Sequence, residues 1–321
     1  MFKVVPHSSG KDSDRVSTEQ ALCQWILEKQ HEVAPATLDF YRQTAFSFLE
    51  YLGGRRTEPI DLVTRQDFVQ FRGELAGRLS AKTVNHRIKT LRMVFEWAFR
   101  DHLVSENYAK QVRSVRNVDR SVRRPFTIEE IRLVLVFSDP EWQSMIRMGL
   151  YTGQRLGDIA RIDWRNVDFQ SGVLRLVTGK TQRRIVIPMA KQLYSYLFLR
   201  WADYVSPGFG PVHPRSKATV IRCEGRVTSL SNQFAGILAA SGLRSKVSHA
   251  ENGRGRSVRR GSNELSFHSL RHTAVSFLRQ AGVSQAVAME LVGHDSVEIS
   301  QQYTHVGLDA LRSATSALPR I

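Results

Sequence analysis

Residues 266–305, SFHSLRHTAVSFLRQAGVSQAVAMELVGHDSVEISQQYTH, combine apolar positions at helical spacing with side chains that bind phosphate or transfer protons. His268, Arg271 and His272 are spaced so that they share one face of a helix. His294 and Tyr303 follow in the same stretch. Such side chains suit chemistry on a phosphate, and no cluster of carboxylates stands beside them to hold a metal ion. The stretch therefore predicts a reactive site that is built largely on helices.

Some of these residues also have simpler interpretations. Two histidines four positions apart can bind zinc, but Ser269 follows His268 where the zinc metalloprotease pattern requires glutamate. We expect His272 to be a packed, hydrogen-bonded residue of the helix interior. Tyr303 fits a surface aromatic as well as a nucleophile. As a nucleophile it needs nearby cations and a base, because the ordinary pKa of tyrosine is about 10.

Two cations that lie far upstream complete the set of candidate residues. In YTGQRLGDIARI, Asp158 follows Arg155 by three positions, so its carboxylate can reach back and orient the guanidinium. A local surface ion pair is the alternative interpretation. Lys180 lies at the tip of a predicted hairpin, VTGKTQRRIV, where a phosphate can tune its proton affinity. TGKT is similar to the end of an ATP-binding P-loop, but Leu174 stands where that motif needs its first glycine, which argues against ATP.

The charge balance indicates a polyanionic partner. Lys and Arg total 46 against 30 Asp and Glu, a formal net charge of +16. A protein with this much positive charge usually binds nucleic acid or an acidic membrane surface. The alternative interpretation is that the charge only keeps the protein soluble. Cys23 and Cys223 lie far apart and belong to no CxxC pair, which favours a reducing compartment. No apolar run of membrane-spanning length and no signal peptide is evident, so we expect a soluble, cytoplasmic protein.

The hydrophobic pattern predicts a mainly α protein with a small antiparallel sheet. Residues 1–16 are interpreted as a flexible tail, and residues 17–104 as a helical domain of four helices with caps at Ser17, Thr64 and Ser80. Residues 105–124 are interpreted as a basic linker, and residues 125–321 as a second domain. Its opening helix begins with a capping box at Thr127 and Glu130. IDWRNVDF and GVLRLVTGKTQRRIVIPM alternate as strands do, and helical signal returns at 190–203 and 229–240.

Basic side chains cluster on the last helix of the first domain and in one loop. On the helix they are Lys82, His86, Arg87, Lys89 and Arg92, for which a solvated face and a DNA-facing one are equally compatible with the pattern. Residues 244–260 are rich in Arg and Lys and are interpreted as a mobile basic loop of unassigned role.

The order Arg, Lys, His-x-x-Arg, His, Tyr resembles the tyrosine recombinase family, also called phage integrases. The resemblance rests on TGQRLGD, VTGKTQRRIVIP, HSLRHTAVSFL and LVGHDSVEISQQYTH, together with the helix ending in LSAKTVNHRIKTLRMVFEWAF. These motifs span roughly residues 17–318. The resemblance implies a SAM-like, core-binding DNA domain followed by an α+β catalytic domain of the DNA breaking-rejoining type.

The resemblance also implies a role for each site residue. Tyr303 would attack a DNA phosphodiester, form a 3'-phosphotyrosyl link and release a 5'-hydroxyl. Arg155 and Arg271 would hold the non-bridging oxygens, and His294 would donate to the phosphate. Lys180 would protonate the departing oxygen and His268 would handle the tyrosine proton. Asp158, in a supporting role, stands where many relatives have glutamate.

No cofactor, metal or ATP is implied, and the expected partner is double-stranded DNA rather than a membrane. The family further implies a homotetramer on synapsed sites, with residues 306–321 passed to a neighbouring subunit. We expect it to act in the cytoplasm near the nucleoid and on mobile genetic elements, and integration, excision, chromosome-dimer resolution and transposition all remain open as its outcome. Because the tail is short, we expect no arm-binding domain. Expected DNA contacts are Lys82, Arg87, Lys89, Arg92 and Arg183. A single-strand topoisomerase with the same tyrosine chemistry and a non-catalytic DNA-binding relative remain alternatives.

Overall fold

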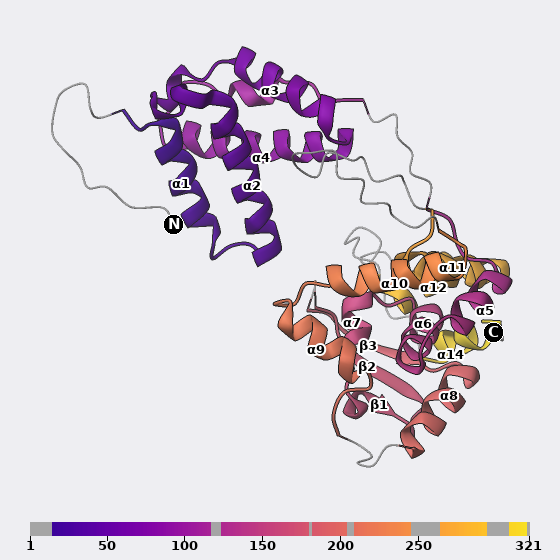
Figure 1. The fold of residues 1–321 in the computed structure, drawn as a ribbon. Coiled ribbons are helices and arrows are strands. Elements are labelled where there is room, and N and C mark those ends of the chain that lie inside the picture. Colours follow the sequence, from indigo (N-terminus) through magenta and orange to yellow (C-terminus); the bar gives the residue numbers. More distant parts are fainter. Residues whose placement is uncertain are drawn as a thin grey trace. The chain divides into compact units, whose positions relative to one another are not determined.

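The chain forms two compact units, shown in Figure 1. The structure is a computed structural model, and it describes residues 15–116, 123–179, 182–203, 209–244, 264–293 and 308–319. Unit 1 comprises the described residues 15–116, and unit 2 comprises the described residues from 123 onward. Among the described residues, no helix is both long and apolar enough to cross a membrane.

Unit 1 is the helical bundle that the sequence predicted. Its main helices are α1 (Thr18–Lys29), α2 (Pro35–Leu52), α3 (Arg65–Arg78) and α4 (Ala81–Arg100), with short 3-10 turns η1 (Gly53–Thr57), η2 (Ile60–Leu62) and η3 (Tyr108–Gln111). The side chains of Ser17, Thr64 and Ser80 each accept a hydrogen bond from a first-turn backbone N–H, as their spacing indicated.

Part of the predicted linker belongs to unit 1. Ala109 and Val112 are buried in its core, because η3 folds back onto α4. Arg92 donates through Nε to the carbonyl of Ala109 (3.2 Å) and through Nη2 to that of Val112. Asn85 exchanges two hydrogen bonds with the backbone of Val115, at 2.9 and 2.8 Å. Long-range contacts to α4 thus order a segment whose own sequence has no apolar period.

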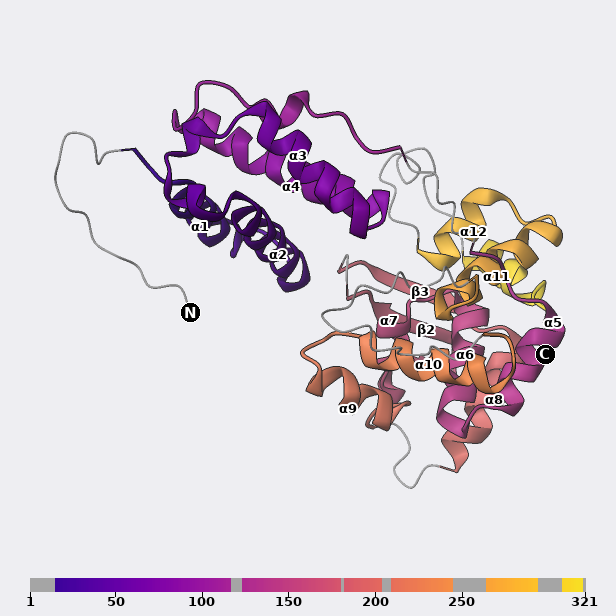
Figure 2. The same ribbon diagram turned by 45° about the horizontal axis from the view of Figure 1, so that its top comes forward.

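Unit 2 contains most of the helices and the sheet. Its helices are α5 (Ile128–Val136), α6 (Pro140–Thr152), α7 (Leu156–Ala160), α8 (Lys191–Ala202), α9 (Pro214–Arg222), α10 (Thr228–Ala240), α11 (Phe267–Gln280), α12 (Gln285–Val292) and α14 (Leu308–Ser316), with the 3-10 turn η4 (Trp164–Asn166). The sequence did not predict α9. Figures 1 and 2 show α11 and α12 next to each other, and these helices also pack together in the contact pattern.

The sheet is small and antiparallel, in the order β1 (Val167–Asp168), β2 (Val173–Val177), β3 (Arg184–Pro188). Val177 pairs with Arg184 at the turn end of the predicted hairpin. The expected strand over IDWRNVDF is mostly wrong, because only two of its residues lie in a strand. The side chains of Asp163 and Asn166 cap each other's backbone and close the turn η4.

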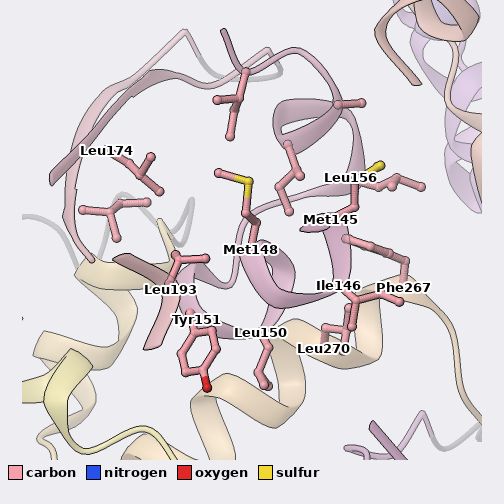
Figure 3. Packing of buried hydrophobic residues seen from close by; sticks show 14 of the residues in the cluster. Met145, Ile146, Met148, Leu150, Tyr151, Leu156, Leu174, Leu193, Phe267 and Leu270 are labelled. Atoms are coloured by element: carbon pink, nitrogen blue, oxygen red, sulfur yellow. The ribbon is translucent and has the colours of Figure 1, made fainter. Parts of the chain in front are cut away.

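Helix α6 lies at the centre of the core of unit 2. Figure 3 shows its side chains Met145, Met148 and Leu150 among apolar residues from β2, α8 and α11. At Gly149 a Cβ atom would lie 2.9 Å from the ring of Phe267, so glycine allows α11 to approach closely. This close packing fixes the end of α6 relative to the start of α11. Arg155 lies in the loop after α6, and Arg271 lies on α11.

The described C-terminal residues pack against their own unit. Leu311, Ala314 and Leu318 lie in its core, and Tyr151 donates from its hydroxyl to the carbonyl of Pro319 (2.9 Å). Helix α14 contacts α12 and β3. The single chain therefore buries the apolar face of α14 against its own unit. The expectation that residues 306–321 pass to a neighbouring subunit stays a prediction.

Candidate active site

The predicted site residues divide into a described and an undescribed set. Arg155, Asp158, His268 and Arg271 belong to unit 2. Lys180, His294 and Tyr303 lie outside the described residues. The geometry of the site is therefore built from the first set and from the segments that lead to the second.

The loop after α6 presents Arg155. Gly153 ends α6 in the left-handed conformation, with φ of 63°, and a Cβ there would lie 2.4 Å from Cγ1 of Val292. Glycine is thus required both by the backbone and by the close approach of α12. Arg155 immediately precedes α7 and is half-buried. The end of α6 and the end of α12 consequently meet next to Arg155, the residue directly before α7.

Arg271 joins these two helix ends. Its side chain is 5% exposed. It donates through Nη1 to the carbonyls of Gly153 (2.9 Å) and Val292, and through Nη2 to that of Gly293 (2.9 Å). A guanidinium has five N–H donors in a fixed plane, so one side chain serves three carbonyls of two separate elements. Arg271 brings a positive charge to the point where α6, α11 and α12 converge.

Gln154 reinforces the same junction, and the sequence interpretation missed it. Its Nε2 lies within hydrogen-bond distance of the carbonyls of Thr152 (3.1 Å), Leu291 (3.3 Å) and Val292 (3.3 Å). A glutamine beside an arginine motif carries no distinctive signal in the sequence. The C-terminal end of α12, which directly precedes His294 in the sequence, is thus held by two side chains from different elements.

His268 and His272 lie together on α11. Their rings meet edge to face with centroids 4.9 Å apart, and both residues are exposed. The prediction that His272 is a core residue is wrong, because it shares the outward face of α11 with His268. Partial burial of the ring, followed by the nearby charges of His272, Arg271, Arg123 and Arg155, lowers the pKa of His268 to about 4. Its imidazole is therefore neutral near neutral pH and able to accept a proton.

Asp158 has a different contact from the one predicted. Its Oδ1 accepts a hydrogen bond from the backbone N–H of Gly179 (2.8 Å) rather than from Arg155. Oδ2 is buried and has no hydrogen-bond partner among the described residues. Asp158 thus holds the end of β2, one residue before Lys180 in the sequence.

The predicted DNA contacts have different surroundings. Lys82 and Lys89 are exposed on α4. Arg87 is half-buried, its Nε has no hydrogen-bond partner within the described part of the chain, and burial and the charge of Arg78 lower its pKa. Arg92 is already bound to backbone carbonyls. Arg183 forms an ion pair with Glu290. Of these residues, Lys82 and Lys89 are the ones presented to solvent on α4.

Metal ligands are not gathered in the part of the chain that the structure describes. No group of three or more His, Cys, Asp and Glu side chains there is arranged to hold an ion.

Two family models match the chain. The model of the Phage integrase family matches residues 127–308, and that of the phage integrase N-terminal SAM-like domain matches residues 24–102. Among curated proteins, the chain is 26% identical over 312 residues to Tyrosine recombinase XerD of Ralstonia nicotianae, covering 92% of each chain. It is 23% identical over 298 residues to Tyrosine recombinase XerD of Staphylococcus aureus, covering 89% of this chain and 93% of that one.

Solved structures share the fold. A lambda integrase dimer bound to a COC' core site aligns with a TM-score of 0.64 and 18% identity, over 91% of this chain and 100% of that one. The Tn1549 transposon integrase in complex with a circular intermediate DNA aligns with a TM-score of 0.65 and 16% identity, over 94% and 99%. The expected helical, SAM-like first domain and the integrase-type second domain with its small sheet are confirmed. The chain belongs to the phage integrase family.

Proposed function

We propose that this protein is a site-specific DNA recombinase that cleaves and rejoins duplex DNA through a covalent 3'-phosphotyrosyl intermediate. The observation that carries the proposal is the convergence of α6, α11 and α12 at Arg271, a buried charge that adjoins Arg155, His268 and the segment leading to His294. Membership of the phage integrase family supports the same activity.

In the proposed reaction, the hydroxyl oxygen of Tyr303 attacks the phosphorus of the scissile phosphodiester. The new bond joins that oxygen to phosphorus, and the bond from phosphorus to the 5'-oxygen breaks. His268 takes the tyrosine proton, and Lys180 gives a proton to the departing 5'-oxygen. The proton taken up at one end thus balances the proton delivered at the other.

The arginines stabilise charge in this reaction. Arg155, Arg271 and His294 would donate hydrogen bonds to the non-bridging oxygens, whose negative charge rises in the pentacoordinate transition state. Burial of Arg271 strengthens such an interaction, because its surroundings screen charge less than water does. The phosphotyrosyl link retains the energy of the original phosphodiester, so rejoining by the 5'-hydroxyl needs no ATP.

The proposed partner is double-stranded DNA, bound largely through phosphates by a chain of net charge +16. A lambda integrase tetramer bound to a Holliday junction shares the fold, with a TM-score of 0.64 at 18% identity. By analogy we propose a homotetramer on two synapsed sites. We also propose that the protein works in the cytoplasm, where the DNA lies, and that mobile DNA is its target.

The test uses a DNA substrate nicked a few nucleotides downstream of the cleavage site, so that the short fragment bearing the released 5'-hydroxyl diffuses away and the covalent adduct accumulates. We expect an adduct of protein and DNA with the wild-type chain and none with Tyr303→Phe, measured by denaturing gel electrophoresis. Persistence of the adduct in Tyr303→Phe contradicts the assignment of the nucleophile. Relaxation of supercoiled DNA without exchange between two sites would instead indicate a topoisomerase.

A further inference from the structure

An ion pair connects the β2–β3 hairpin to α12. Nη2 of Arg183 lies 2.6 Å from Oε1 and 2.7 Å from Oε2 of Glu290, and the two residues are 107 positions apart in the chain. Both side chains are partly shielded, with 37% and 38% of their surface exposed. We propose that Arg183 and Glu290 are positioning residues, whose ion pair holds the hairpin in register with the active-site end of α12.

Arg183 belongs to a rigid part of the hairpin. The backbone N–H of Thr178 donates to the carbonyl of Arg183 (3.0 Å), and the N–H of Arg183 donates to Oγ1 of Thr178 (3.1 Å). Gln182 also donates from its backbone N–H to the carbonyl of Thr178 (2.9 Å). These hydrogen bonds join the backbone at Arg183 to the opposite side of the hairpin, so the position of Arg183 is coupled to that of Thr178 at the end of β2.

Glu290 belongs to a helix end that is itself fixed. The carbonyls of Leu291, Val292 and Gly293 accept hydrogen bonds from Gln154 and Arg271. The ion pair thus ties the hairpin to the junction of α6, α11 and α12. Asp158, through the backbone of Gly179, adds a second tie from α7 to the end of β2.

The consequence for catalysis rests on the proposed function. Lys180 precedes Arg183 by three residues in the sequence, and it is the proposed proton donor to the 5'-oxygen. Proton transfer requires the donor within hydrogen-bond reach of its acceptor, and a misplacement of about 1 Å can reduce a rate about 100-fold. Fixing the hairpin against α12 therefore serves the departure of the leaving group.

The ion pair also argues against Arg183 as a DNA contact. Glu290 neutralises its charge at short range, and a neutralised pair attracts phosphate much less than a free guanidinium does. This interpretation replaces the expectation, from sequence alone, that Arg183 contacts DNA.

The experiment measures single-turnover adduct formation on two nicked substrates. One has the natural 5'-oxygen at the scissile phosphate and the other has a 5'-bridging sulfur. With sulfur, the P–S bond breaks and the thiolate departs with its electron pair unprotonated, since thiols have a pKa of about 8.5 and need no proton donor. The variants are Glu290→Gln, Arg183→Gln and the exchange Arg183→Glu with Glu290→Arg.

We expect the two single variants to form adduct about 10- to 100-fold more slowly than wild type on the oxygen substrate and at nearly the wild-type rate on the sulfur substrate. The exchanged pair should recover much of the oxygen rate. Arg175→Gln is the matched control, because Arg175 forms an ion pair on the same hairpin but with Asp168 of β1. It should leave both rates unchanged.

Other outcomes overturn the proposal. Equal slowing on both substrates means that the pair does not act through the leaving group. Weaker DNA binding in Arg183→Gln together with tighter binding in Glu290→Gln makes Arg183 a DNA contact. Wild-type rates in both single variants exclude a positioning role. Failure of the wild-type chain to form an adduct through Tyr303 refutes the proposed function instead, and this inference with it.

Discussion

The two units differ in what their interiors use to hold the chain. In unit 1 the core is built on aromatic rings, with Phe48 against Phe68 (5.4 Å between centroids) and Phe68 against Phe95 (4.8 Å). The interior of unit 2 contains, besides apolar residues, the charged or titratable side chains of Glu141, Asp158, His213 and Arg271. Apolar contacts hold helices together without demanding one orientation, whereas hydrogen bonds are directional.

The reach of the polar contacts differs as well. In unit 1 the buried Asp67 binds Arg55 and Thr64, which are 12 and 3 positions away. In unit 2, Arg271 binds the carbonyl of Gly153, 118 positions away, and Gln154 binds that of Val292, 138 positions away. Unit 2 therefore uses buried polar groups to place loop ends around a site. Unit 1 relies on ring packing, supplemented by polar contacts of shorter sequence separation such as those of Arg92 to the carbonyls of Ala109 and Val112.

The largest expected effect tests the aromatic core of unit 1. Phe48→Ala removes a fully buried ring and should lower the free energy of unfolding of unit 1 by about 3–5 kcal/mol. Phe46, on the same helix, is 59% exposed, so Phe46→Ala should change it by less than about 0.5 kcal/mol. Hydrogen exchange followed by mass spectrometry measures each unit separately. Equal effects of the two variants would contradict the conclusion that the buried aromatic rings stabilise unit 1.

The next effect is the dependence of the stability of unit 2 on pH, through the buried His213. His213 is fully buried, receives a hydrogen bond from Ser144 or donates one to it, and pairs with the carbonyl of Ile159. Burial lowers its pKa from 6.5 to about 4. The unfolded chain takes up a proton below pH 6.5 while the folded chain stays neutral, so the contribution is present above pH 6.5 and is lost as pH falls toward 4. The loss is at most about 3 kcal/mol.

The measurement for His213 is chemical denaturation of unit 2 between pH 7 and 4. His213→Asn should flatten the decline of stability with falling pH. The pKa of His268 is also lowered to about 4, so His268→Asn should flatten the decline too, but by less than His213→Asn because His268 is exposed on α11. A decline that is unchanged in His213→Asn would show that other groups control acid sensitivity.

The smallest expected effect concerns Arg92, a polar side chain that stabilises unit 1. Arg92 holds two backbone carbonyls, whereas Lys89 on the same helix is exposed. Arg92→Ala should lower the stability of unit 1 by about 1–3 kcal/mol. Lys89→Ala should leave stability unchanged and, if it contacts a phosphate, reduce the slope of log affinity against log salt by about 1. Denaturation and DNA-binding titrations at several salt concentrations separate the two; unchanged stability in Arg92→Ala would deny its bracing role.

Features that depend on neighbours in the chain could be predicted from the sequence. The caps at Ser17, Thr64, Ser80 and Thr127 form because each side chain binds an N–H three residues ahead. The hairpin of β2 and β3 follows from alternation on both sides of a turn. The strand expected over IDWRNVDF failed because a competing turn, closed by Asp163 and Asn166, uses the same residues.

By itself the sequence determined most of the helices, the hairpin, the family and the order of the candidate catalytic residues, because these depend on local spacing and on residue type. Only the tertiary structure decided which partners the charged side chains take. Asp158 binds Gly179 instead of Arg155, Arg183 pairs with Glu290, and His272 faces outward. The physical reason is that a charged side chain binds the nearest complementary group in space. Which group that is depends on how α6, α11 and α12 pack, a property that no local spacing expresses.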